Sequence, residues 1–116
     1  MWIFTGYILW RFYVSGKHRI SLDELTRFIF GYLWKRYGMI LNDSIEELKM
    51  ELEYMEKFGY IDLGDGVLKL KEKLKDFYNI VECSSLAREN KLFREYIEKI
   101  SKAMLKYLVI EDLVEV

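Results

Sequence analysis

Residues 45–74, IEELKMELEYMEKFGYIDLGDGVLKLKEKL, contain the pattern that decides the fold. The first part has apolar residues at helical spacing and ends at Gly59, a typical helix C-cap. Two short segments of alternating polarity follow, at 60–63 and 67–71, and Gly64-Asp65-Gly66 joins them with a sequence suited to positive φ. The stretch therefore predicts a helix followed by a β-hairpin whose lysines point outward.

Two capping patterns place further helix starts. Ser21 followed by Glu24, and Ser44 followed by Glu47, each fit the capping box of a helix N-terminus. The first of these helices ends near Tyr37-Gly38. The very apolar segment 3–14 precedes a polar turn at 15–19, and we expect it to form a core helix.

A long helix is predicted near the C-terminus, from about Leu86 to Leu108, after a break at Cys83-Ser84-Ser85. Its apolar residues form one stripe, which we expect to be a dimer interface. The stripe comprises Leu92, Phe93, Tyr96, Ile97, Ile100, Met104 and Tyr107. The chain then divides into residues 1–80, the main domain, and 81–116, the dimerisation element. The tail from Val109 could form a short strand or a frayed end.

Composition narrows the class of protein. The chain has 116 residues, a net charge of −1 and 52% hydrophobic residues, which fits one domain with its own core. Abundant charged and aromatic residues without proline favour a thermophilic source. The single cysteine, Cys83, fits a reducing, cytoplasmic setting. The apolar N-terminus is too short for a membrane span and is interrupted by Arg11, so we expect no membrane association.

The order of these elements resembles winged helix-turn-helix proteins, in particular archaeal, MarR-like or PadR-like transcriptional regulators. The resemblance covers about residues 3–77 and is one of order and spacing. It implies a mainly α fold with a small β-hairpin, an α+β class. In that family the third helix enters the DNA major groove, the wing reaches phosphates and a final helix often forms a homodimer.

Carried onto this chain, the resemblance implies a set of double-stranded DNA contacts. At the groove these are Asn42, Ser44, Glu47 and Lys49, and at the wing Lys69, Lys71 and Lys73. The wing lysines also fit a second interpretation, in which they only solvate the exposed face of the hairpin. Lys35 and Arg36 add basic charge and lie between Trp34 and Tyr37, a cluster that would also suit base stacking on single strands.

The charge distribution departs from the family. Residues 43–62 contain seven acids and two lysines, a local net charge of −5, and we expect Glu47 and Glu51 to oppose DNA binding. Residues 1–42 contain six bases and two acids, a local net charge of +4. Two functions therefore stay open: a DNA-binding transcriptional regulator, or a winged-helix module whose acidic helix binds a protein partner.

Catalysis is not expected. His18 is the single histidine, lies in a polar turn and has no cysteine or histidine nearby in sequence, which argues against a metal site. The chain has no phosphate-binding loop and no pairing of a nucleophile with a base. We therefore predict a protein without an enzymatic role and without a cofactor.

Overall fold

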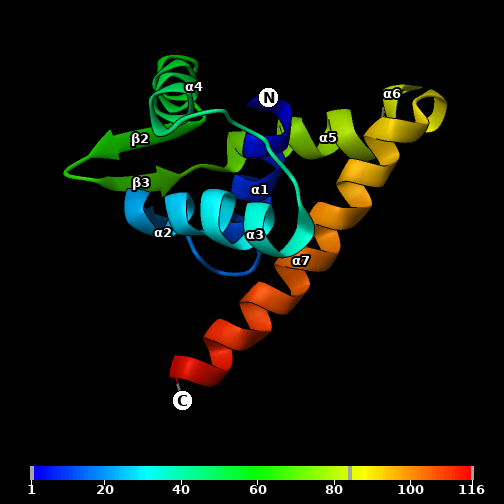
Figure 1. The fold of residues 1–116 in the computed structure, drawn as a ribbon. Coiled ribbons are helices and arrows are strands. Elements are labelled where there is room, and N and C mark those ends of the chain that lie inside the picture. The colour runs from blue at the N-terminus through cyan, green and yellow to red at the C-terminus, as the bar shows by residue number, and fades with distance from the viewer. Residues whose placement is uncertain (1, 84, 116) are drawn as a thin grey trace.

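A computed structural model of the chain describes residues 2–83 and 85–115. These residues are mainly helical and form one small antiparallel sheet of three strands, which confirms the α+β class (Figure 1). In Figure 1 the β-hairpin projects from the body of the helices, and the last helix runs diagonally to the C-terminus.

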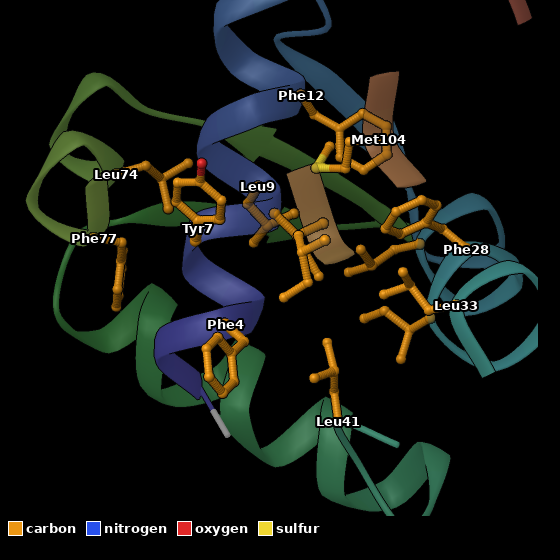
Figure 2. Packing of buried hydrophobic residues seen from close by; sticks show 14 of the residues in the cluster. Phe4, Tyr7, Leu9, Phe12, Phe28, Leu33, Leu41, Leu74, Phe77 and Met104 are labelled. Atoms are coloured by element: carbon orange, nitrogen blue, oxygen red, sulfur yellow. The ribbon is translucent and has the colours of Figure 1, made fainter. Parts of the chain in front are cut away.

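The first helix, α1 (Trp2–Val14), is the centre of the core, as its dense apolar sequence predicts. Figure 2 shows its side chains meeting residues from the rest of the chain on several sides. Tyr7, Ile8, Leu9 and Phe12 are all at most 1% exposed. Gly6 lets the Phe77 ring approach closely, because a Cβ built at Gly6 would lie 2.5 Å from that ring.

A short strand, β1 (Arg19–Ser21), runs from the end of the predicted turn at 15–19 to the predicted N-cap, where no strand was expected. It was missed because three residues give no readable alternation, and its ladder partner lies 48 residues away at Leu68, opposite Ile20. Ile20 is buried, so the strand adds one apolar side chain to the core.

The second predicted helix is one run of helical segments: α2 (Leu22–Thr26), a π-helical segment η1 (Arg27–Leu33) and α3 (Trp34–Tyr37). Ser21 caps it as predicted, since its Oγ accepts from the Glu24 backbone N–H over 3.0 Å. Glu24 is the second residue of the predicted capping box, and its carboxylate accepts hydrogen bonds from the Lys17 ammonium and the Tyr107 hydroxyl. Gly38 ends the run with φ of 65°. The sequence did not predict the π segment, because its buried residues recur at a spacing that also fits an α-helix.

Helix α4 (Ile45–Lys57) has the predicted bounds and caps. The Ser44 Oγ accepts from the Glu47 N–H over 3.1 Å at its start. At its end Gly59 has φ of 83°, its N–H donates to the Glu56 carbonyl, and the Tyr60 N–H donates to the Met55 carbonyl. These two bonds are those of a Schellman motif.

The predicted hairpin is present as β2 (Ile61–Gly64) and β3 (Val67–Leu70). Its two central residues, Asp65 and Gly66, both have positive φ, which the tight type I′ turn requires. The strand order is β1-β3-β2. Leu68 and Leu70 face the core, and Lys69 between them is exposed, as predicted.

The C-terminal part comprises η2 (Glu72–Leu74), α5 (Lys75–Cys83), α6 (Ser85–Glu89) and α7 (Lys91–Glu115). Part of the predicted break, Ser84, lies outside the described residues. The single helix predicted from Leu86 is divided before α7, where the Asn90 Oδ1 caps the Phe93 N–H over 3.0 Å. The tail from Val109, for which a strand was one expectation, continues α7 to Glu115.

Candidate functional site

The candidate site is the side of α4 that points away from the core. Leu48, Leu52 and Met55 bury the inward side of this helix completely. The opposite side carries exposed residues that we call the outward face, and these are Glu46, Lys49, Met50, Glu53, Tyr54 and Lys57. This is the helix that the family resemblance places in a DNA groove.

Two large side chains dominate the outward face. Met50 is 57% exposed and Tyr54, one turn later, is 55% exposed. An open depression of about 270 Å³ lies between them, Glu53 and Lys57. Apolar and aromatic side chains one turn apart on an exposed helix face form a compact contact area for a partner.

The residues predicted to read a groove have other roles at the start of α4. Asn42 is only 1% exposed, and its Nδ2 donates to the Glu51 carboxylate over 2.6 Å. The Ser44 hydroxyl caps the helix, and the Glu47 carboxylate accepts from the Asp43 N–H over 3.4 Å. The expectation that Asn42 faces DNA is therefore wrong in this fold, because the side chain is buried. Lys49, the fourth predicted groove residue, is exposed and takes no part in the helix cap.

Most of the acids in residues 43–62 accept hydrogen bonds or form an ion pair within the chain. Glu51 accepts from Thr5 over 3.2 Å as well as from Asn42, so it does not oppose DNA as an exposed charge. Glu56 accepts from the Leu63 N–H over 2.6 Å, and Asp62 forms an ion pair with Lys71 over 3.0 Å. Glu47 accepts from a backbone N–H at the cap. Bonds from such neutral donors leave the carboxylates of Glu47, Glu51 and Glu56 charged, so residues 43–62 keep an acidic excess.

The wing lysines also divide by role. Lys71 pairs with Asp62. Lys73 donates from Nζ to the Phe58 carbonyl over 2.6 Å and lies 4.7 Å from the centre of the Tyr60 ring, so it supports the C-terminal end of α4. Lys69 is exposed, and no hydrogen bond or ion pair engages its side chain within the described residues. It lies directly opposite Arg19 in the β1–β3 ladder, which puts two like charges side by side.

The second basic cluster lies at the end of α3. Lys35, Arg36 and Trp34 are exposed, with Trp34 at 42%. The Arg36 guanidinium lies 5.3 Å from the centre of the Tyr32 ring. Burial is the main cause that raises the pKa of Tyr32, and a hydrogen bond with Tyr37 adds to it. The aromatic rings beside this cluster thus pack on one another.

The predicted dimer stripe packs inside one chain. Ile100 and Met104 are fully buried, and Phe93 and Ile97 are at most 9% exposed, all against the core around α1. The Tyr107 ring lies 4.9 Å from that of Phe28. Phe93, Ile97, Ile100 and Met104 cannot form a dimer interface without leaving the core, so the expected interface is wrong for these four. Tyr107 is half-buried against the same core. Leu92 and Tyr96 are 60% and 37% exposed, and Tyr96 also packs edge-on against Phe4.

The remaining predicted features are surface features. His18 is exposed and stacks on Tyr13, with ring centres 4.4 Å apart. Cys83 is an exposed free thiol. Within residues 2–83 and 85–115 no group of three histidine, cysteine or acidic residues could hold a metal ion, and no helix is long and apolar enough to cross a membrane.

Comparison with known proteins adds no relative. No family model, curated protein or solved structure matches this chain. The chemistry of the exposed side chains is therefore the basis for assigning a function.

Proposed function

We propose that this chain is a winged-helix protein that acts by binding another polypeptide on the outward face of α4. The element order supports the winged-helix part: a core helix, a short strand, two helices and a β-hairpin, with the first strand on the far side of the hairpin. This is the order in which the family resemblance predicted the helices and the wing.

The observation that carries the docking function is the exposure of Met50 and Tyr54. Each side chain shows more than half of its surface to solvent on a helix whose other side is fully buried. Covering such side chains is favourable by roughly 25 cal/mol per Å² of apolar surface. A polypeptide partner can cover them, whereas the polar groove of DNA offers few apolar contacts.

Reading a DNA sequence through α4 fits the contacts less well. Base readout requires polar side chains that are free to reach base edges at the start of the helix. Here Asn42 is buried, and Ser44 and Glu47 are engaged in the helix cap. The free charges of the helix do not supply the positive excess that binds phosphate.

A site-specific crosslink tests the docking function. A photoreactive residue replaces Met50 in the full chain, which is then irradiated in an extract of its source organism. The matched control carries the same residue at Leu105, which is 58% exposed on α7. We expect a nuclease-resistant adduct, larger than the chain alone, from position 50 and none from position 105. A nuclease-sensitive adduct, or equal labelling at both positions, contradicts the proposal.

One observation favours DNA as a second candidate. Arg19 and Lys69 lie opposite each other on the exposed side of the sheet as a pair of like charges, while Asp62, opposite Lys69 on β2, forms its ion pair with Lys71. If these residues hold a phosphate backbone, binding to mixed double-stranded DNA weakens steeply with salt. Arg19→Glu with Lys69→Glu then abolishes retention, while Lys99→Glu on α7 does not. This candidate is removed if the double substitution leaves DNA binding unchanged, or if the wild type does not bind DNA even at low salt.

A further inference from the structure

We infer that the partner on the outward face of α4 is a second copy of this chain, bound by the same face in an antiparallel helix pair. The inference rests on the proposed docking function and names its occupant.

The free charges of the outward face are self-complementary in that arrangement. Glu46, Lys49, Glu53 and Lys57 are exposed, and no salt bridge engages them within the part of the chain that the structure describes. Glu53 and Lys57 are four residues apart on the helix, but no ion pair joins them in that part of the chain. These two acids and two lysines sum to zero, so the outward face itself has no excess of either sign.

Antiparallel pairing brings each acid to a lysine. In a two-fold contact, residues whose numbers add up to about the same value face one another. Glu46 then meets Lys57 of the second copy, and Lys49 meets its Glu53, because both pairs share nearly one sum (103 and 102). A parallel pair in register would instead place like charges together.

The apolar residues meet in the same register. Met50 and Tyr54 give a sum of 104, so each Met50 packs on a Tyr54 ring near the two-fold axis. Contacts between a methionine sulfur and an aromatic ring are favourable, and the methionine side chain adapts to the space available. In an antiparallel pair the two helix dipoles also point in opposite directions, which is favourable.

Other occupants fit the face less well. A uniformly basic surface would meet the exposed Lys49 and Lys57, which lie among the acids of the outward face, and would be repelled by them. A partner that matches alternating charges around two apolar residues must carry the same pattern at the same spacing. The same helix in a second copy carries it.

The contact is small, so the dimer is weak and depends on concentration. Helix α4 has 13 residues, which span about 20 Å. One such helix pair falls below the roughly 1,200 Å² of total area that stable interfaces bury. We therefore expect monomers at low concentration and dimers only as the concentration rises.

Sedimentation equilibrium over a wide concentration series tests the inference on the full chain. We expect the wild type to pass from monomer to dimer. Lys57→Glu should weaken association roughly tenfold, because the symmetric contact loses its exposed ion pair twice and gains repulsion. The swap of Glu46→Lys together with Lys57→Glu should restore it. Lys99→Glu on α7 is the matched control, and thermal melts verify that each variant is folded.

Each contrary outcome has one meaning. A wild type that stays monomeric at all concentrations, or a dimer indifferent to Lys57→Glu, overturns self-pairing. So does a charge swap that fails to restore association. If the position-50 probe then still crosslinks to a different polypeptide, the docking function stands and only its partner was wrong. If it crosslinks to no polypeptide, both proposals fail.

Discussion

The side-chain amide of Asn42 donates to the Glu51 carboxylate over 2.6 Å and joins the loop before α4 to the inward side of that helix. Thr5 of α1 donates to the same carboxylate oxygen over 3.2 Å. Helix α4, the loop that leads into it and the distant helix α1 thus meet at one half-buried carboxylate. The contact holds α4 against the core, so that its other side is the one that faces outward.

Replacing Asn42 by alanine should lower the free energy of unfolding by about 1–3 kcal/mol, since it removes a donor from a half-buried carboxylate. Urea unfolding measures this change. Asp43→Ala is the matched control, because that side chain is exposed and its loss should cost within about 0.5 kcal/mol. Equal stability of the two variants would mean that the bond does not support the fold.

Replacing Ile100 by alanine tests whether the α7 stripe belongs to the core of one chain. The side chain is fully buried, so we expect a loss of about 2–5 kcal/mol in urea unfolding. Leu92→Ala, at a side chain that is 60% exposed, should change stability by less than about 1 kcal/mol. If Ile100→Ala shifted a dimer to monomer and left the stability of the monomer unchanged, the stripe would be an intermolecular interface after all.

Two glycine substitutions separate close packing from helix propensity. A Cβ at Gly6 would lie 2.5 Å from the buried Phe77 ring, so Gly6→Ala should destabilise by about 1–3 kcal/mol. At Gly31 a Cβ meets nothing within 4 Å, and Gly31→Ala should be neutral or stabilise by up to about 1 kcal/mol. Thermal melts of both variants provide the comparison. A stabilising Gly6→Ala would show that α1 and α5 do not pack this closely.

The buried phenol of Tyr7 predicts a loss of stability in alkaline solution. Burial is the main cause that raises its pKa above 10.0, and the neighbouring Glu82 adds to it. Because the folded chain holds this proton more tightly than the unfolded chain, the contribution is full below pH 10.0. It is lost as pH rises through the higher folded value. Tyr7→Phe should flatten the alkaline slope of the unfolding free energy. An unchanged slope would assign the effect to other tyrosines, such as Tyr60.

The local sequence was sufficient to predict the helix starts, the helix end and the turn that short-range interactions decide. Ser21 and Ser44 each cap a backbone N–H three residues ahead, and both helix starts are where the sequence predicted them. Gly59 and the Asp65-Gly66 turn need positive φ, which few residues adopt at low cost, so the helix end and the hairpin were equally readable.

Alternation of apolar and polar residues in the hairpin likewise predicted correctly that Leu68 is buried and Lys69 exposed. The helical period of α7 indicated an apolar stripe, but a period only says that one side will be covered. It does not say whether the cover comes from the same chain or from another.

Tertiary structure alone decided the partners of each side chain. The strand β1 exists because β3 pairs with it, and Asn42 is buried because Glu51 and α1 converge on it. Lys73 is not free at the wing, because its Nζ donates to the Phe58 carbonyl at the end of α4. Such contacts join residues far apart in sequence, so no local pattern records them. The sequence determined where the two serine-capped helices begin and where the hairpin turns, and the packing determined which charges remain free for a partner.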